Sequence, residues 1–268
     1  MKKFIAIILT AMLAVVACLG LTACGKNSDY EYVKNKGTLN IGITIYDPMD
    51  YFDEDGETII GFDADVARKV CKELGLNATF CIIKWDSKVL ELNSKAIDCI
   101  WNGMTVNDDL KNNLTLSIPY AENMQVAVVK AANKDAINSV DTVKAASIAV
   151  ENGSAGNAVA IDTLKATTVY PVGSQLAALN EVAAGTSQVA IIDLTMAKSV
   201  VGKGDFTDLV IVDTNAVAFE EEEFAIGFRK GSDLAEKVNE LLKKYYADGS
   251  LQEIADNYSG SISIKEIK

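Results

Sequence analysis

Polar residues follow the ends of three predicted strands and together could bind a small charged molecule. Residues 102–105 (Asn-Gly-Met-Thr) follow one strand, and residues 153–156 (Gly-Ser-Ala-Gly) follow another and open a helix. The start of a helix favours an anion because its first backbone N–H groups are unpaired. Asp193 ends a third strand and offers a carboxylate to a cation. An anion site opposite an acid suits a small zwitterion such as an amino acid.

The chain between these motifs alternates between strand and helix patterns. Apolar residues recur every four positions from Phe62 to Leu74, which predicts a helix capped by Asp63 and ended by Gly75. Alternating strands and helices predict parallel α/β sheets, which bind ligands beyond the carboxyl ends of their strands. The alternation stops near Tyr120 and restarts near Ser147, so we expect two lobes.

The predicted lobes are discontinuous in the sequence. The first lobe comprises residues 37–121 and a return segment, 221–268, with two C-terminal helices, while residues 122–220 form the second lobe. The chain then crosses twice between the lobes, and two crossings form a hinge.

Composition excludes several classes of function. The 268-residue sequence carries a net charge of −12, which argues against nucleic acid or an anionic lipid surface as the working partner. It contains no histidine, which excludes histidine-based triads, general bases and metal ligands. Cys71, Cys81 and Cys99 are expected to be buried thiols, although a disulfide between two of them would leave one over. We expect neither a cofactor nor a metal.

The N-terminus is typical of an exported protein. Lys2 and Lys3 precede an apolar run from Phe4 to Leu21, which is the layout of a secretory signal peptide. At about 18 residues the run is also long enough for an uncleaved transmembrane helix. The following tetrad ends at Cys24 (Leu-Thr-Ala-Cys) and resembles the bacterial lipoprotein box, in which the cysteine is acylated, typically with palmitate.

The lipoprotein box favours cleavage over a membrane-spanning leader. We therefore expect a signal peptide over residues 1–23, lipid on Cys24 and a polar tether over residues 24–36. Several acyl chains on one cysteine give a stable anchor. The protein is then expected at the extracytoplasmic face of the cell membrane, in an envelope of Gram-positive type, because a cell without an outer membrane would lose a diffusible binder.

Several segments, in their order and spacing, resemble the family 3 extracellular solute-binding proteins, which bind amino acids for ABC importers. The resemblance covers residues 37–260 and rests on these segments: 37–42, 61–65, 102–105, 118–120, 153–156, Asp193, 224–231 and 247–251. It implies a two-lobed, periplasmic-binding-protein-like fold of type II, with two crossing hinge strands that let the lobes close on the ligand. It also implies a monomer without enzymatic activity, whose partners are a small polar solute and the permease subunits.

The resemblance assigns binding roles to residues of the first lobe. Tyr46 falls where an aromatic ring stacks on the ligand side chain, and Trp85 where the first lobe supplies another wall. Asn102, Gly103 and Thr105 fall where the ligand ammonium and carboxylate are held.

The resemblance also assigns roles to the second lobe. Ser154, with the amide of Ala155, is expected to hold the carboxylate, and Asp193 is expected to pair with the α-ammonium. Further candidates lie near these positions: Met49, Tyr51, Leu110, Lys111, Glu151 and Glu222.

The sequence departs from the family pattern at two positions. Leu110 stands where the family usually carries an arginine that grips the carboxylate, and Met49 stands where an aromatic residue is usual. A hydrogen bond to a charged group contributes about 1.5–3 kcal/mol, so losing the arginine lowers affinity for a carboxylate about tenfold to a hundredfold. Lys111 could substitute, or an amino acid could bind more weakly through Thr105 and the helix start.

A third possibility is that the ligand is a cationic amine and not an α-amino acid, which Glu151 and Asp193 would favour.

Two further functions compete with solute capture. Some relatives of this fold are cyclohexadienyl dehydratases, and Glu151, Asp193 or Glu222 could supply the required acid or base. The protein could also sense a ligand for a separate membrane receptor. The acidic residues 220–223 are expected to be a solvated face at the second hinge crossing, not a metal site.

Overall fold

The computed structural model describes residues 28–267, so the predictions for the signal peptide and for Cys24 lie outside the described residues.

The strands of the first lobe are β1 (Thr38–Ile43), β4 (Asn77–Ile82), β5 (Cys99–Ile100), β6 (Leu114–Leu116) and β13 (Gly227–Arg229). They form a sheet with the order β4-β1-β5-β13-β6. β1 runs parallel to β4 and β5, whereas β13 is antiparallel to β5 and β6.

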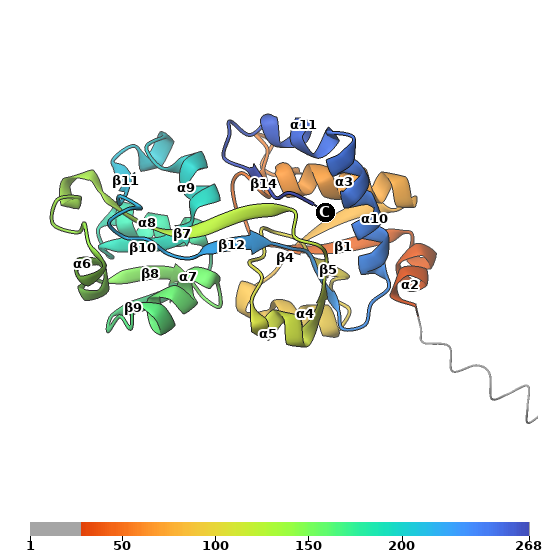
Figure 1. Cartoon of the computed structure of the whole chain (residues 1–268), viewed down its shortest axis with the longest axis horizontal. Coiled ribbons are helices and arrows are strands. Elements are labelled where there is room, and N and C mark those ends of the chain that lie inside the picture. Colours follow the sequence, from red (N-terminus) through yellow and green to blue (C-terminus); the bar gives the residue numbers. More distant parts are fainter. Residues whose placement is uncertain (1–27, 268) are drawn as a thin grey trace, which may run out of the picture.

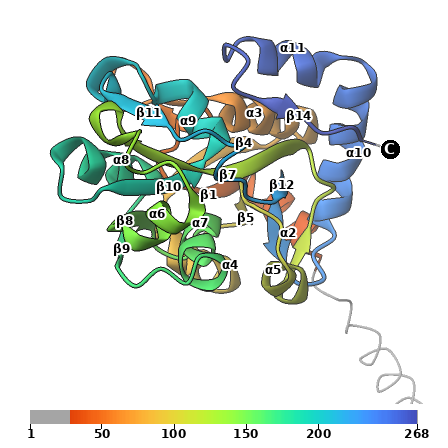
Figure 2. The same cartoon turned by 60° about the vertical axis from the view of Figure 1, so that its left-hand side comes forward.

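Helices cover both faces of this sheet (Figures 1 and 2). One face packs against α3 (Phe62–Leu74), α10 (Leu234–Ala247) and α11 (Ser250–Asp256). The other face packs against α4 (Lys88–Asn93) and α5 (Asp108–Asn113). A two-stranded hairpin of β2 (Tyr51–Phe52) and β3 (Ile59–Ile60) precedes α3.

The second lobe has the same layered design. Its strands are β7 (Ala121–Lys130), β8 (Ile148–Glu151), β9 (Val169–Val172), β10 (Val189–Asp193) and β11 (Leu209–Ile211). The order is β11-β7-β10-β8-β9, with β8 parallel to β9 and β10 and with β7 antiparallel to its neighbours. Its helices are α6 (Val140–Ala145), α7 (Ala155–Ala158), α8 (Gln175–Ala184) and α9 (Leu194–Val200).

Alternating side chains on the central strands divide the core of this lobe into two layers, as the two-residue period of a strand requires. On β7, Val126 and Val128 belong to the cluster that contains the buried residues of α8 and α9. Ala127 and Val129 belong to the cluster on the opposite face, with the buried Val143 of α6. The predicted two-lobed α/β architecture is confirmed, although both sheets are mixed because the chain returns through antiparallel strands.

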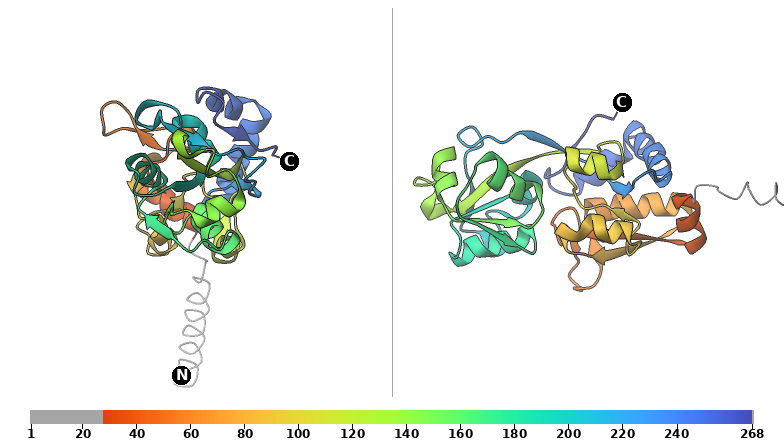
Figure 3. Two further views of the ribbon diagram at one scale, coloured as in Figure 1. Left: turned by 90° about the vertical axis from the view of Figure 1, so that its left-hand side faces the viewer. Right: turned by 90° about the horizontal axis from the view of Figure 1, so that it is seen from below.

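Two antiparallel strands connect the lobes, and Figure 3 shows the connection from below. The first part of β7 pairs with β12 (Glu221–Phe224), in the register Glu221↔Met124 to Phe224↔Ala121. β14 (Ser263–Ile264) also pairs with this part of β7. From Gln125 onward β7 pairs instead with β10 and β11. A single strand thus runs from the hinge into the centre of the second sheet.

The segment before β1 differs from the prediction. Residues 29–36, expected to belong to a tether, form helix α2 (Asp29–Lys36). The Ser28 hydroxyl caps its start by accepting from the Glu31 N–H at 3.0 Å, and Gly37 ends it in the left-handed conformation. Val33 is fully buried. The tether prediction is therefore wrong from Asp29 onward, because this segment caps its own ends and packs on the first lobe.

Two further predictions concern the ends of α3 and the state of the cysteines. Helix α3 ends at Gly75 as predicted, but its N-cap residue is Gly61 and not Asp63. The described cysteines are free thiols, and Cys71 and Cys99 are buried while Cys81 is half-buried. None of the helices within residues 28–267 has the length and apolarity to cross a membrane.

Arg229, at the end of β13, fixes α2 to the first lobe. Its guanidinium donates to Asp29 at 2.8 and 3.0 Å and to the carbonyls of Leu92 and Ile97 at 3.1 and 2.8 Å. It also lies 3.5 Å from the fully buried carboxylate of Asp98. Removing one partner of a buried ion pair costs about 3–5 kcal/mol because the other charge stays buried.

Replacement of Arg229 should therefore strongly destabilise the first lobe. We expect Arg229→Met to lower the free energy of unfolding by about 3 kcal/mol, measured by urea denaturation. The matched control is Lys237→Met, because Lys237 makes only an exposed pair with Glu240 and such pairs contribute about 0–1 kcal/mol. Equal stability of the two variants would contradict the structural role of Arg229.

Candidate functional site

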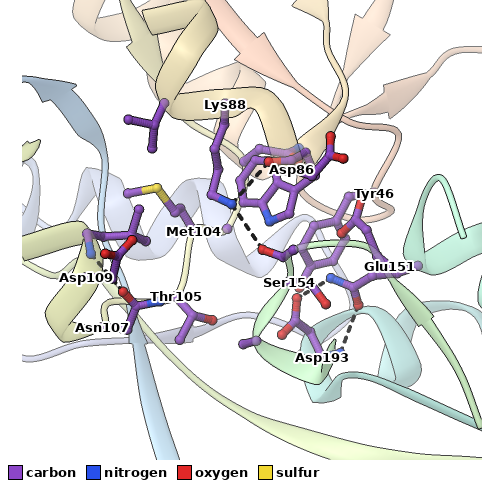
Figure 4. A pocket seen from close by; sticks show the side chains of 18 of the residues that line it. Tyr46, Asp86, Lys88, Met104, Thr105, Asn107, Asp109, Glu151, Ser154 and Asp193 are labelled. Atoms are coloured by element: carbon purple, nitrogen blue, oxygen red, sulfur yellow. Dashed lines mark hydrogen bonds between the residues drawn. The ribbon is translucent and has the colours of Figure 1, made fainter. Parts of the chain in front are cut away.

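A cleft of about 440 Å³ lies between the lobes, where the carboxyl ends of several strands meet (Figure 4). All eight residues proposed from the sequence as the main ligand contacts line it: Tyr46, Trp85, Asn102, Gly103, Thr105, Ser154, Ala155 and Asp193. Of the further candidates, Leu110 and Glu151 also line it. Met49 is instead fully buried in the core, and Tyr51, Lys111 and Glu222 are not among the lining residues.

Asp193 is a buried acid held by three side-chain amides. The amides of Asn123 and Gln125 donate to Oδ1 at 2.7 and 2.6 Å, and that of Gln175 donates to Oδ2 at 2.5 Å. β10 places it there, because Asp193 pairs with Gln125 in the sheet register. Burial raises the pKa of Asp193, while these amides act in the opposite direction. A carboxylate offers about four lone-pair sites, so Oδ2 retains acceptor capacity for a ligand.

Two aromatic residues form walls of the cleft. Tyr46 lies in the loop after β1 and Trp85 begins the short helix before α4, and both are buried. The hydroxyl of Tyr46 has no hydrogen-bond partner within residues 28–267. Burial raises the pKa of Tyr46, and the neighbouring Asp193 raises it further. The phenol therefore stays protonated, with its hydroxyl near Asp193.

Asn102 and Gly103 line the cleft, but their polar groups bond within the first lobe. Asn102 Oδ1 accepts from the N–H and the hydroxyl of Thr44, both at 2.9 Å, and its Nδ2 donates to Asp50 at 2.8 Å. The Gly103 N–H donates to Asp63 at 2.7 Å. These contacts favour a structural role, which is to hold the loop that carries Tyr46.

Gly103 is required for this packing. Its φ is +54°, and an added Cβ would lie 2.8 Å from Cε1 of Tyr46. Asp63, predicted to be a helix cap, instead receives the Gly103 N–H and the hydroxyl of Tyr120, the latter at 2.8 Å.

Glu222 lies at the hinge, on β12. Its Oε2 accepts from Thr105 at 3.1 Å and from the same amides that bind Asp193, those of Asn123 at 3.1 Å and Gln125 at 2.9 Å. Burial raises the pKa of Glu222 to about 7, and the charge of Asp193 contributes in the same direction. Thr105 thus joins the first lobe to a strand that crosses between the lobes.

Lys88, the first residue of α4, is a site residue that the sequence analysis missed. It is the only lysine or arginine among the described residues that line the cleft. Its ammonium donates to the carbonyls of Trp85 and Gly153, both at 3.1 Å, and lies 4.7 Å from the centre of the Trp85 ring. Its position one helical turn after Trp85 was the available signal, because residues three apart share a helix face.

Lys111, considered from the sequence as a substitute for the missing arginine, points elsewhere. Its side chain is 58% exposed and lies 3.4 Å from Asp108. The carbonyl of Lys111 accepts from Lys230 at 2.7 Å, which ties this turn to the outer side of the lobe. Lys88 and not Lys111 therefore supplies the positive charge of the cleft.

The start of α7 lies close to β10 because Gly156 allows it. A Cβ at Gly156 would lie 2.6 Å from the carbonyl oxygen of Ile191 on β10, so only glycine permits this approach. The Ser154 hydroxyl accepts from the Asn157 N–H at 3.1 Å, which leaves its own hydrogen available for a ligand. Ser154 also follows Gly153, the residue whose carbonyl binds Lys88.

The lobes touch across the cleft, so the structure is a closed one. Besides the bond from Lys88 to Gly153, Asn152 Nδ2 donates to Asp86 at 2.8 Å. The hydroxyl of Ser199 donates to Asp47 farther along the same boundary.

Glu151 ends β8 inside the closed cleft. It is 3% exposed, and its Oε1 has no hydrogen-bond partner within the described part of the chain. Burial raises the pKa of Glu151 to about 8, with a further contribution from Asp193, whereas Lys88 acts in the opposite direction.

These buried acids predict an unusual dependence of stability on pH. In the folded protein the pKa is raised to about 7 for Asp63 and for Glu222, and to about 8 for Glu151. In an unfolded chain these carboxyl groups have pKa values of about 4. Between these values the folded protein holds protons that the unfolded chain has released, so the free energy of unfolding falls as pH rises. No histidine titrates in this window.

We therefore expect the melting temperature of the ligand-free protein to fall between pH 5 and pH 8. Glu222→Gln keeps an acceptor oxygen for the three donors but removes one titrating group, so it should make the decline shallower. Differential scanning calorimetry across this range measures both effects. A melting temperature that rises toward pH 8 would contradict the assignment.

The sequence matches known binding proteins along most of its length. The profile of the bacterial extracellular solute-binding proteins, family 3, matches residues 39–261. The L-cystine-binding protein TcyJ of Escherichia coli is 27% identical, with 92% of each chain covered. The arginine-binding extracellular protein ArtP of Bacillus subtilis is 29% identical, with 95% of this chain and 96% of the relative covered.

A solved structure shows the same fold. The ancestral amino-acid-binding protein described as a precursor of cyclohexadienyl dehydratase superposes with a TM-score of 0.79 at 27% identity. The match covers 86% of this chain and 99% of that protein. Because the family profile spans both lobes and the cleft between them, the chain belongs to the bacterial extracellular solute-binding proteins of family 3.

Proposed function

We propose that this protein captures an amino acid outside the cell and delivers it to the permease of an ABC importer. The observation that carries the proposal is the closed cleft, whose lining includes both a buried acid, Asp193, and an ammonium, that of Lys88. An α-amino acid carries the two complementary charges. Relatives whose names specify cystine or arginine bind solutes of this class.

The α-ammonium of the solute binds Asp193. The three amide donors fix this carboxylate in place, and the remaining acceptor capacity of Oδ2 accommodates one more hydrogen bond. A solute ammonium also supplies the positive charge that the buried carboxylate lacks, because the amides around it are neutral.

The α-carboxylate binds Lys88 and Ser154. An ammonium has three donors, and two of those on Lys88 go to carbonyls, which leaves one for the ligand. Burial lowers the pKa of Lys88, so an added carboxylate stabilises its charged form. Lys88 thereby replaces the arginine that is absent at Leu110, whose buried side chain completes the apolar wall.

The protein acts by binding and closure, without catalysis. Two of the three acids considered for a dehydratase are held by side-chain amides: Glu222 accepts from Asn123 and Gln125, and Asp193 accepts from three amides. Ligand sensing in trans would use the same closure, and growth on the solute as a nutrient distinguishes import from sensing.

The protein works as a monomer anchored at the outer face of the cell membrane through lipid on Cys24, after removal of residues 1–23. Helix α2 starts at Asp29, so four residues connect the lipidated cysteine to the fold. Fully extended, they span about 14 Å at most. Such a short connection keeps the cleft near a membrane-embedded permease, and it suits a Gram-positive type envelope.

A matched pair of lysine variants tests the carboxylate site. Each amino acid, and the amine formed by removing its carboxylate, is titrated calorimetrically into the purified protein. Lys88→Met should weaken binding of the cognate amino acid about tenfold to a hundredfold, as expected for a hydrogen bond to a charged group. It should leave binding of the corresponding amine nearly unchanged.

Lys111→Met is the control because it removes the same charge outside the cleft. Equal affinities of the two variants would contradict the proposed carboxylate site. If the amine binds as tightly as its amino acid in the unaltered protein, the ligand is a cationic amine instead. Absence of a melting-temperature shift with every amino acid would refute amino-acid capture itself, because a ligand at 100 times its Kd adds about 2.7 kcal/mol.

A further inference from the structure

Glu151 is a buried acid that the closed protein leaves unpaired. Its side chain ends β8, faces the cleft and is 3% exposed, yet Oε1 lacks any partner among residues 28–267. A buried carboxylate oxygen without a hydrogen bond is costly, so most such groups in native proteins are satisfied by the protein or a ligand. In a binding cleft, the missing partner is most simply the ligand.

The surrounding residues do not satisfy Glu151. Asp193, by comparison, receives three amide hydrogen bonds. Lys88 attracts Glu151 electrostatically, but the described residues include no ion pair within 4.0 Å between them, and the Lys88 ammonium bonds to carbonyls instead. The titratable groups facing Glu151 are thus Asp193 on β10 and Lys88 on α4. The hydroxyl of Thr44, after β1, also lies near Glu151 and lowers its pKa, but it donates to Asn102 Oδ1 at 2.9 Å.

Glu151 and Asp193 are neighbours on adjacent parallel strands. β8 and β10 pair in parallel as far as Ala190↔Ala149, and Glu151 and Asp193 are the last residues of these two strands. Neighbouring strands lie about 4.8 Å apart, so two acids project from one sheet edge into one cleft. Figure 4 shows both side chains at this edge. Such a pair repels when both are ionised, and two positive groups on one ligand relieve that repulsion.

We propose that the solute carries a second cationic group, which binds Glu151 while Asp193 holds the α-ammonium. This inference rests on the proposed function and narrows its substrate class to amino acids with two cationic groups. An ammonium or guanidinium donates to the unpaired Oε1 and completes its hydrogen bonding. The aromatic rings of Tyr46 and Trp85 flank the chain that joins the two groups, since both line the same cleft.

Occupation by a cation is coupled to proton release. Burial and Asp193 raise the pKa of Glu151 to about 8, so the carboxyl group holds a proton at neutral pH unless a cation lies beside it. A bound cation favours the ionised carboxylate and expels that proton. A neutral side chain has no such effect on Glu151.

Binding to the unaltered protein provides the first test. Calorimetric titration compares arginine with citrulline, which has nearly the same shape without the charge, and lysine with norleucine. We expect arginine or lysine to bind at least tenfold more tightly than its neutral counterpart. Cystine is a further probe, because its second ammonium comes with a second carboxylate. The inference would be overturned if the neutral counterparts bound as tightly as the cationic amino acids and cystine. Amino-acid capture would still stand after that result.

The second test replaces the acid. Glu151→Gln should lower the affinity for the cationic solute about tenfold to a hundredfold and change the affinity for its neutral counterpart less than about threefold. It should also abolish the proton release on binding, which is measured by calorimetric titration in buffers of different ionisation enthalpy. Asp205→Asn is the control, because it removes one negative charge at an exposed position of the same lobe. If Glu151→Gln lowered the affinity for both solutes equally, the role of Glu151 would be structural and the inference would be overturned.

Discussion

Two amides on one strand hold the hinge and the binding cleft in a single network. Asn123 and Gln125, on β7, each donate both to Asp193 in the cleft and to Glu222 on the second crossing strand. Because β7 pairs with β12 before this point and with β10 after it, a change of twist at the hinge moves the amides that orient Asp193. Lobe closure and the geometry of the ligand acid are therefore coupled by the backbone of one strand. A solute that binds Asp193 then favours the closed arrangement by its differential contacts there.

The charges of the cleft depend on that closure. Lys88 belongs to the first lobe, and the carbonyl of Gly153 that orients it belongs to the second. Glu151 ends β8 of the second lobe and is buried in the closed cleft. In an open protein these groups contact water, which solvates an unpaired charge. Closing without a solute buries an acid and an ammonium that satisfy each other incompletely, whereas a zwitterionic solute offsets that cost.

Much of the fold was predictable because its signals are local. The period of four in α3, the restart near Ser147 and the small-residue turn before α7 each depend on a short stretch of sequence. The position of Asp193 in the cleft followed from the rule that ligands bind beyond the carboxyl ends of parallel strands, whereas the positions of Tyr46 and Trp85 followed from the family resemblance. The role of Lys88 was not predictable in this way, because its burial requires contact with the other lobe. Asn102 matched the motif, but the partners that occupy its amide, Thr44 and Asp50, lie more than fifty residues away in sequence. Helix α2 was missed because its charged composition resembles a solvated linker until Arg229 and Asp233 provide its partners.

The account assigns a fixed orientation to the solute, and a crystal structure of the protein with its tightest-binding amino acid tests it most directly. The α-ammonium is predicted to lie within hydrogen-bond distance of Asp193, about 2.7–3.2 Å, with the carboxylate at the Lys88 ammonium and the Ser154 hydroxyl. A solute bound with its carboxylate turned away from Lys88, or bound outside the cleft between the lobes, would contradict the central claim.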